Sequence, residues 1–194
     1  MIKNKNITGI ILAGGKSSRM GADKGFIKLN NKSFAEYSIK ALKPLVNDII
    51  IVSDNPDYDA FGYKRILDEI KDAGPVAGIY SGLNASKTEN NLILSCDIPL
   101  IKTGVLEKLI ESFDDDSEVI QIESNGKTMP LIALYKKQNA KVFLEALQND
   151  ERRLRRVINS LKTKNVVLND DEQNTTMNVN TKEELKTIED VYKD

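Results

Sequence analysis

Short apolar runs rich in Val, Ile and Leu recur along the chain, separated by turn residues and by helical patterns. Continuous runs of this kind are typical of strands that are buried on both faces of a sheet. We expect such strands at residues 7–13, 48–52, 64–67, 92–96, 118–122, 130–135 and 165–168. The helical patterns lie near residues 33–45, 76–85, 103–113, 138–148 and 152–161, and a further one begins near Thr181. Strands that alternate with helices predict an α/β fold with a mostly parallel sheet.

Local signals place several boundaries. Ser33 with Glu36, and Thr181 with Glu184, have the spacing of a capping box at a helix start. Asn125–Gly126 is a two-residue hairpin signal, so one piece of the sheet should be antiparallel. The polar segment 169–176 is expected to be an exposed loop, and the acidic run 114–116 a solvated turn.

Composition excludes several classes of protein. A chain of 194 residues suits one domain, 1–194, and 28 basic against 29 acidic residues exclude a basic protein that coats nucleic acid. The absence of histidine excludes Ser-His-Asp and Cys-His catalysis. Cys96 is the single cysteine and cannot form an internal disulfide, which favours a cytoplasmic location, and no apolar run is long enough to span a membrane. Chemistry must therefore use carboxylates, Lys, Arg, backbone amides or a metal held by oxygen.

A glycine-rich segment follows the first predicted strand directly. It reads LAGGKSSRMGADKG from Leu12 to Gly25 and carries the cations Lys16, Arg19 and Lys24. Glycines at the end of a parallel strand let backbone N–H groups approach an anion, and the cations add compensating charge. The segment matches neither a Walker A loop nor the dinucleotide fingerprint. It predicts a polyphosphate-binding loop; the alternative is a flexible turn with surface cations.

Asp97 follows the apolar run 92–96, at the carboxyl end of a predicted parallel strand. Ligands bind at this edge of open α/β sheets. A carboxylate there suits Mg²⁺, which takes one or two protein oxygens and leaves its other positions to water and phosphate. The alternative is a turn aspartate ahead of Pro99.

The string LAGGKSSRMGADKGFIKLNNKSF resembles the signature of the molybdenum cofactor guanylyltransferases. These belong to the nucleotidyltransferases with a Rossmann-like, GT-A-type fold. Four later segments match in the same order: GPVAG at 74–78, CDIPL at 96–100, MPLIALY at 129–135 and NVNTKEEL at 178–185. The resemblance covers roughly residues 7 to 188. It implies a three-layer α/β/α arrangement, with a nucleotide-binding half at about 7–100 and an acceptor-binding half at about 101–190.

The resemblance also implies roles for individual residues. Asp97 would hold Mg²⁺ and, with Lys24 and Arg19, form the catalytic group. The residues expected around GTP are Leu12, Ala13, Gly14, Gly15, Lys16, Lys24, Ser53, Asp68, Gly78 and Asp97. Gly15 favours a guanine nucleotide because related cytidylyltransferases have alanine at this position. Ser53 replaces an asparagine of some relatives, and Gly78 ends a Pro75–Gly78 turn that would close over the base or simply begin a helix.

The resemblance also implies acceptor binding at Asn178 and Asn180, whose amide oxygens could ligate Mg²⁺ or bond a pterin phosphate; the alternative is that they cap the entry of the helix near Thr181. The cations Arg152, Arg153, Arg155 and Arg156 form either a solvated face or an anion-binding surface.

The implied reaction is transfer of GMP from Mg-GTP to the terminal phosphate of molybdopterin, which yields the guanine dinucleotide and pyrophosphate. An anionic phosphate acceptor needs no general base, so the missing histidine is consistent with it. The expected partners are these two substrates and, transiently, proteins that deliver or receive the cofactor, with no nucleic acid or membrane. Two alternatives stay open: a cytidylyl or sugar nucleotidyltransferase of the same fold, and a non-catalytic nucleotide-binding subunit.

Overall fold

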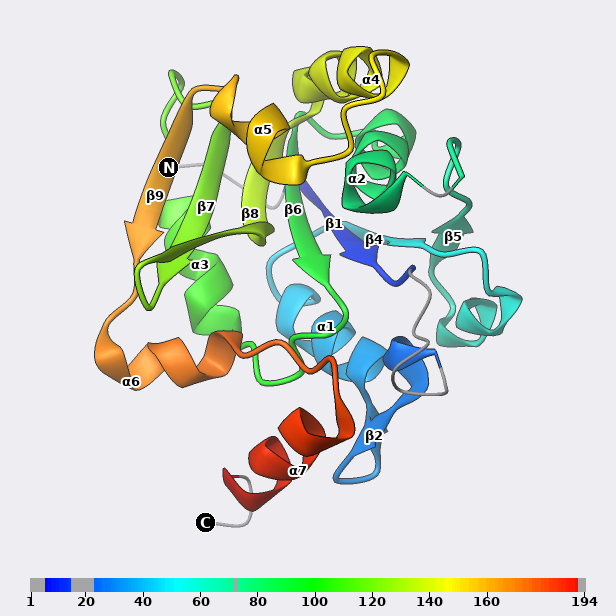
Figure 1. Ribbon diagram of the computed structural model, residues 1–194, viewed down its shortest axis with the longest axis vertical. Coiled ribbons are helices and arrows are strands. Elements are labelled where there is room, and N and C mark those ends of the chain that lie inside the picture. Colours follow the sequence, from blue (N-terminus) through cyan, green and yellow to red (C-terminus); the bar gives the residue numbers. More distant parts are fainter. Residues whose placement is uncertain (1–5, 15–22, 72, 192–194) are drawn as a thin grey trace.

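The computed structural model describes residues 6–14, 23–71 and 73–191. Within these residues a seven-stranded sheet has the order β5-β4-β1-β6-β8-β7-β9 (Figure 1). Its strands are β1 (Ile7–Leu12), β4 (Asp48–Val52), β5 (Lys64–Ile66), β6 (Asn90–Ser95), β7 (Val119–Ser124), β8 (Lys127–Lys136) and β9 (Thr163–Val167). Each expected strand is therefore present, within a few residues of its expected bounds.

The sheet is parallel except at β8, which pairs antiparallel with both β6 and β7. The turn between β7 and β8 is Asn125–Gly126, with φ angles of 51° and 68°. Positive φ at both central residues is what a type I′ hairpin turn requires. The predicted mostly parallel sheet with one antiparallel strand is confirmed.

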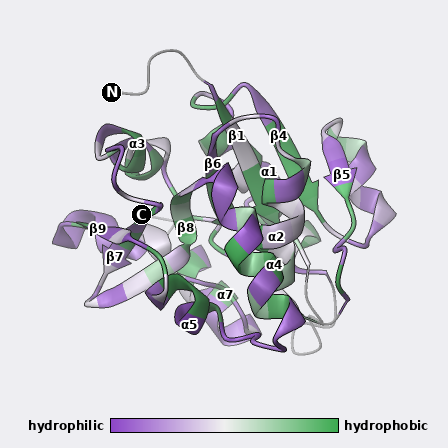
Figure 2. Cartoon of the chain, turned by 90° about the horizontal axis from the view of Figure 1, so that it is seen from above, coloured by the Kyte–Doolittle hydropathy of each residue, from purple (hydrophilic) through white to green (hydrophobic). Residues whose placement is uncertain are grey.

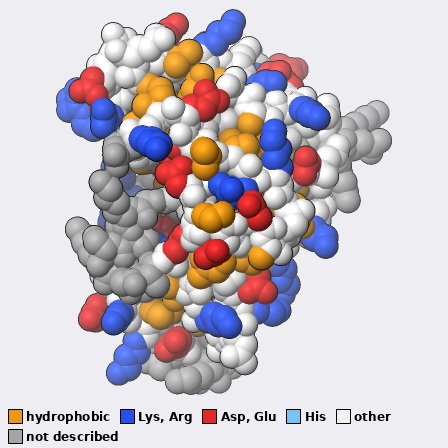
Figure 3. All heavy atoms as spheres, turned by 90° about the vertical axis from the view of Figure 1, so that its right-hand side faces the viewer, with side chains coloured by type: hydrophobic (Ala, Val, Ile, Leu, Met, Phe, Trp, Pro, Cys, Tyr) orange, Lys and Arg blue, Asp and Glu red, His pale blue; other side chains and the backbone are white. Residues whose placement is uncertain are grey.

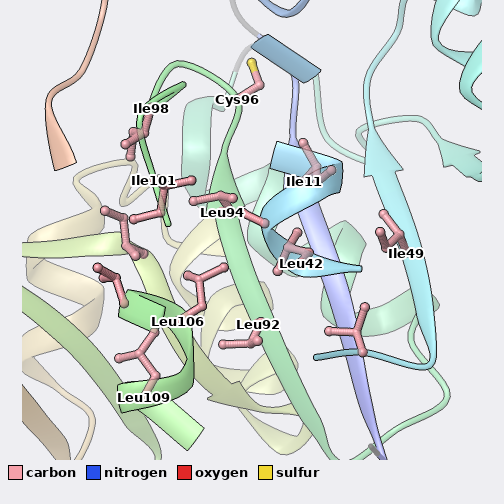
Figure 4. Packing of buried hydrophobic residues seen from close by; sticks show 14 of the residues in the cluster. Ile11, Leu42, Ile49, Leu92, Leu94, Cys96, Ile98, Ile101, Leu106 and Leu109 are labelled. Carbon is pink, nitrogen blue, oxygen red and sulfur yellow. The ribbon is translucent and has the colours of Figure 1, made fainter. Parts of the chain in front are cut away.

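Helices cover both faces of the sheet and make three layers (Figure 1). Helices α1 (Phe34–Leu42) and α3 (Thr103–Glu111) pack on one face, and α2 (Gly74–Ala85), α4 (Ala140–Gln148) and α5 (Leu154–Asn159) pack on the other. Neighbouring strand residues belong to different hydrophobic clusters: Ile11 shares a cluster with Leu42 and Leu106 (Figure 4), whereas Ile10 belongs to the cluster on the opposite face. Figure 2 shows both hydrophilic and hydrophobic residues along these helices, as helices that cover a sheet require.

Helix α2 lies unusually close to the centre of the sheet. A Cβ atom on Gly82 would stand 2.5 Å from Cγ2 of Ile10 on β1. A Cβ atom on Gly78 would stand 3.3 Å from Cδ2 of Leu12 on the same strand. Glycine at these two positions therefore sets the distance between α2 and β1.

Both predicted capping boxes are present. Glu36 N donates to Ser33 Oγ at 3.3 Å, and Ser33 N donates to the Glu36 carboxylate at 2.6 Å. At the start of α7 (Lys182–Val191), Glu184 N donates to Thr181 Oγ1 and Thr181 N donates back to the Glu184 carboxylate. Each reciprocal pair satisfies backbone N–H groups that the first helical turn leaves without a partner.

A two-stranded hairpin was not predicted. It consists of β2 (Lys28–Leu29) and β3 (Lys32–Ser33), with Asn30 and Asn31 between them at φ angles of 47° and 64°. Asparagine tolerates the left-handed region better than other side chains do, so the Asn-Asn pair was the available signal. The hairpin packs with α7 around buried Leu29.

The prediction that residues 169–176 form an exposed loop was wrong. The segment contains the short helix α6 (Asp170–Gln173) and the 3-10 turn η4 (Asn174–Thr176). Thr175 and Thr176 are buried, and their hydroxyls donate to the backbone oxygens of Glu172 and Gln173. Threonine hydroxyls that bond to backbone three residues earlier allow a polar segment to pack.

Charged side chains are mixed on the surface. Figure 3 shows Lys and Arg side chains interspersed with Asp and Glu on the face it presents. This agrees with the formal net charge of −1. No helix among the described residues is long and apolar enough to cross a membrane.

Candidate active site

The carboxyl ends of the central parallel strands meet at one edge of the sheet. Leu12 at the end of β1 is in register with Val52 of β4 and with Ser95 of β6. The backbone continues this pairing, because Ala13 N donates to Val52 O at 3.0 Å and Cys96 N donates to Leu12 O at 3.1 Å. In Figure 1 the arrowheads of β1 and β6 point toward the part of the molecule that holds β2 and α7.

Asp97 lies at this edge with its side chain 15% exposed. Ser95 Oγ donates to Asp97 Oδ1 at 2.6 Å, which holds the carboxylate in one orientation. Sequence reasoning missed Ser95, although a polar residue near the end of an apolar strand, two positions before an aspartate, was the available signal. Among the described residues no cluster of three or more acidic, cysteine or histidine side chains could hold a metal ion. A metal here would take Asp97 as its protein carboxylate and draw its other ligands from substrate and water, a mode that Mg²⁺ uses with phosphates.

Lys24 joins Asp97 to the C-terminal part of the chain. Its ammonium group lies 3.4 Å from Asp97 Oδ2 and also donates to Asn180 Oδ1. The Lys24 side chain is 22% exposed, so its charge is partly withdrawn from water. Asp97 and Asn180 lie 73 and 156 residues after Lys24 in the sequence, yet the three predicted side chains meet at one point.

The segment before α7 is fixed to the loop that follows β6. Val179 N donates to the backbone oxygen of Asp97 at 2.8 Å, and Val179 is fully buried. This bond brings Asn180 to the site. Asn178 is exposed and, among the described residues, makes no hydrogen bond with Lys24 or Asp97, so the two asparagines are not equivalent.

Asp68 follows β5 at the same edge and lies beside Gly14, which follows β1, and Gly78 of α2. Its Oδ2 is 3.9 Å from the position of a Cβ on Gly14, and its Oδ1 is 3.5 Å from that of a Cβ on Gly78. Oδ1 is buried and has no hydrogen-bond partner among the residues that the structure describes. Burial, with a smaller contribution from the charge of Asp54, raises the pKa of Asp68 to about 6. A buried acceptor oxygen without a hydrogen-bond partner is suited to a ligand that donates an N–H or O–H group.

Gly78 lies within α2 and does not form a separate turn. The helix begins at Gly74 with Pro75 in its first turn, which was the alternative interpretation of this segment. Ser53 is buried, and its hydroxyl accepts a hydrogen bond from Asn55 N at 3.2 Å. Ser53 therefore already uses its hydroxyl to shape the chain after β4.

Three predicted residues, Gly15, Lys16 and Arg19, lie outside the residues that the structure describes. The position of the predicted phosphate-binding loop is thus described at its two ends, Gly14 and Asp23.

Other candidates lie away from this edge or are packed. Burial raises the pKa of the Cys96 thiol, and Cys96 belongs to the hydrophobic cluster beneath the site (Figure 4). Arg153 and Arg156 pair with Glu151, Arg152 pairs with Asp150, and α5 lies at the opposite end of the sheet (Figure 1). Their exposed ion pairs agree with the interpretation of a solvated face.

A cavity of about 570 Å³ lies between α1, residues 99–103 and the α6 region. Its lining includes Tyr37, Lys40, Lys102 and Asp171, and none of the predicted site residues that the structure describes. The chemistry-bearing side chains are therefore gathered at the strand edge and not around this cavity.

Comparison with known proteins agrees with this geometry. A family model described as a MobA-like NTP transferase domain matches residues 9–166. A probable molybdenum cofactor guanylyltransferase of Flavobacterium johnsoniae is 35% identical over 184 residues, which cover 95% of this chain and 97% of the relative. The molybdenum cofactor guanylyltransferase of Polynucleobacter asymbioticus is 35% identical over 199 residues, which cover 97% and 98%.

Solved structures show the same fold. The molybdopterin-guanine dinucleotide biosynthesis protein A of Archaeoglobus fulgidus superposes with a TM-score of 0.82 at 22% identity, covering 96% of this chain and 98% of that chain. A protein of Aquifex aeolicus superposes with a TM-score of 0.74 at 26% identity, covering 93% and 96%. The resemblance found in the sequence motifs is confirmed: the chain belongs to the MobA-like NTP transferase family and is a nucleotidyltransferase.

Proposed function

We propose that this enzyme transfers GMP from Mg-GTP to the terminal phosphate of molybdopterin and releases pyrophosphate. The observation that carries the proposal is the meeting of Lys24, Asp97 and Asn180 at the carboxyl edge of the sheet, the edge that also holds the buried acceptor of Asp68. The names of the relatives that match almost the whole chain support the same reaction.

In this proposal the nucleotide lies along the carboxyl ends of β1, β4 and β5. The backbone of residues 12–14 lines the phosphates and base, Gly15 leaves room for a purine, and Lys16 and Arg19 add charge from the same loop. Asp68 accepts a hydrogen bond from the nucleoside, because its buried Oδ1 gains the donor that the described residues do not supply. Gly78 keeps α2 close to Asp68, and Ser53 contributes through its backbone and the turn that it stabilises.

Mg²⁺ is proposed at Asp97. The fit depends on the donor set: a carboxylate that is 15% exposed, whose Oδ1 accepts from Ser95 and whose Oδ2 lies 3.4 Å from the Lys24 ammonium group. When bound, the ion would neutralise phosphate charge. Because the described residues provide no cluster of three or more metal-binding side chains, the metal and the triphosphate should bind together.

The acceptor is proposed to approach from the side of Asn178 and Asn180. In this proposal residues 1–194 form a single domain, in which residues 7–100 bind the nucleotide and residues 101–190 bind the acceptor. Asn180 holds Lys24 and so stands between the two substrates. Exposed Asn178 is free to face the acceptor.

The chemistry requires positioning more than proton transfer. An oxygen of the acceptor phosphate attacks the α-phosphorus of GTP, and the bond from that phosphorus to the bridging oxygen of pyrophosphate breaks. The acceptor is already ionised at neutral pH, so no general base is needed, and the chain contains no histidine. Lys24 offsets charge on the leaving pyrophosphate, which is the main demand of phosphoryl-type transfer.

The proposal extends to the setting of the enzyme. A single buried cysteine suits the reducing cytoplasm. The expected partners are the two substrates and, transiently, proteins that supply or accept the cofactor, with no nucleic acid.

The test is pyrophosphate release with molybdopterin, Mg²⁺ and one nucleoside triphosphate at a time. GTP should support turnover while CTP and UTP do not. Turnover with CTP or UTP, and none with GTP, would contradict the guanylyl assignment.

Site variants test the residue roles in the same assay. Asp97→Asn and Lys24→Ala should each lower kcat at least ~100-fold, as expected for groups that stabilise transition-state charge. Asp116→Asn is the matched control, because Asp116 is exposed in the turn before β7. Unchanged product formation in both site variants would show that the site is wrongly assigned.

A further inference from the structure

Lys24 follows directly on an aspartate whose carboxylate accepts three hydrogen bonds. Asp23 Oδ1 accepts from Gly25 N at 3.0 Å and from Tyr58 Oη at 2.6 Å. Asp23 Oδ2 accepts from Asn55 Nδ2 at 3.0 Å. The bond to Gly25 N caps the 3-10 turn η1 (Lys24–Phe26), so the carboxylate sets the backbone on both sides of Lys24.

Tyr58 is a rigid donor in this network. Its side chain is fully buried, and its ring lies 4.6 Å from the Phe26 ring and 5.9 Å from the Phe61 ring between centroids. A Cβ atom on Gly25 would stand 1.9 Å from the Tyr58 hydroxyl, so the ring lies directly against the backbone next to Lys24. Burial raises the pKa of Tyr58 well above its usual range, so the hydroxyl stays protonated and donates.

Asn55 links the same carboxylate to the end of β4. It caps the 3-10 turn η2 (Pro56–Phe61) by accepting from Asp57 N at 3.0 Å, and its own backbone N–H donates to Ser53 Oγ. A continuous path of hydrogen bonds therefore runs from Ser53 at the strand edge, through Asn55, to Asp23, the residue before Lys24.

From this arrangement we infer that Tyr58 and Asn55 are positioning residues that act through Asp23 to fix the Lys24 ammonium group at the phosphate site. A lysine side chain carries its charge at the end of a flexible four-carbon stem and provides a point charge without fixed geometry. Stabilisation of developing charge requires that such a group be held close to its productive position before the reaction. The network supplies this by fixing the backbone from which Lys24 extends, while Asn180 and Asp97 hold its tip.

The inference rests on the proposed role of Lys24 in binding the triphosphate. A double-mutant cycle separates the two claims. Four proteins are compared: wild type, Tyr58→Phe, Lys24→Ala and the double variant. The measurements are the Kd for Mg-GTP by calorimetry and the Tm by circular dichroism.

Tyr58→Phe should weaken Mg-GTP binding about tenfold, the lower end of what removing a residue that orients a ligand group costs. In the Lys24→Ala background the same change should have no further effect on Kd, because the group that it positions is absent. A merely structural role would weaken binding equally in both backgrounds.

Tyr135→Phe is the matched control. Tyr135 is also fully buried, and its hydroxyl donates to the Pro130 backbone oxygen at 2.8 Å, on the antiparallel strand β8. Its Tm should fall by an amount similar to that of Tyr58→Phe, while its Kd for Mg-GTP stays within twofold of wild type. Asn55→Ser provides a second route, since serine keeps the cap of η2 and loses the donor to Asp23. It should also weaken Mg-GTP binding, and only when Lys24 is present.

The outcomes are distinguishable. Suppose that Lys24→Ala weakens Mg-GTP binding. If Tyr58→Phe and Asn55→Ser then leave binding unchanged, or weaken it equally with and without Lys24, the positioning role is overturned and the proposed function stands. If Lys24→Ala leaves Kd unchanged, the proposed role of Lys24 fails, and this inference fails with it.

Discussion

Replacing Gly82 with alanine tests how closely α2 approaches the sheet. The new Cβ would stand 2.5 Å from Cγ2 and 3.2 Å from Cδ1 of Ile10, and 3.5 Å from Cγ2 of Val52. Ile10 is fully buried and β-branched, so it has few rotamers by which to move away. Relief of the contact therefore requires α2 to shift away from β1.

The magnitude follows from two opposing effects. Overpacking of a well-packed core costs about 1–3 kcal/mol, and a contact of 2.5 Å belongs in the upper part of that range. Replacement of a helical glycine by alanine raises the free energy of unfolding by about 1 kcal/mol through helix propensity. The net loss should be about 1–2 kcal/mol, which lowers the Tm of a chain of this size by roughly 2–8 °C.

Gly104 in α3 provides the control, because a Cβ there meets nothing within 4 Å. Gly104→Ala should gain helix propensity without a clash and raise the Tm by about 2–4 °C at most. Thermal unfolding followed by circular dichroism compares the two variants. Removal of the clashing atoms by Ile10→Ala should also cost about 1 kcal/mol less in the Gly82→Ala background than in wild type. Equal Tm values for the two glycine variants, or an equal cost of Ile10→Ala in both backgrounds, would refute the reasoning.

Two further predictions concern the site. The raised pKa of Asp68, about 6, means that the folded protein favours the neutral carboxyl, so the associated stability is present below pH 4 and is lost as the pH rises through 6. Asp68→Asn should therefore have a higher Tm than wild type at pH 7, and this difference in Tm should disappear near pH 4. Thermal melts in which the difference in Tm does not depend on pH would contradict this. Asp116→Asn serves as the control. Ser95→Ala removes the donor to Asp97 and should raise the Mg²⁺ concentration for half-maximal pyrophosphate release about tenfold, whereas Ser160→Ala should not. An unchanged Mg²⁺ dependence would show that Ser95 does not orient the carboxylate.

The order of strands and helices could be predicted because it depends on local patterns. Apolar runs such as 92–96 are buried on both faces, and the capping boxes at Ser33 and Thr181 depend on residues three positions apart. Asp97 could be placed at the sheet edge for the same reason, since it follows a recognisable strand.

The contacts among the candidate residues could not be predicted in this way. The bond between Lys24 and Asn180 joins positions 156 residues apart, and only the path of the whole chain brings them together. Tyr58 lies in a polar stretch that reads as an exposed turn, yet Phe26 and Phe61 bury its ring. The burial of Thr175 and Thr176 likewise depends on partners supplied by the fold, such as the Ser124 hydroxyl, which lies 2.8 Å from the Thr176 hydroxyl.

The hydrogen bond from Val179 N to the Asp97 backbone oxygen bears on which residues the proposed site needs. The family model matches the chain as far as residue 166, before the segment that supplies Val179 and Asn180, although relatives align over almost the whole chain. A chain shortened to that boundary would keep most of the sheet but would expose the Asp97 carbonyl oxygen, release the tip of Lys24 and uncover Leu29. The region that the family model matches therefore leaves out residues that the proposed site needs, and residue 166 should not be used as the end of that site.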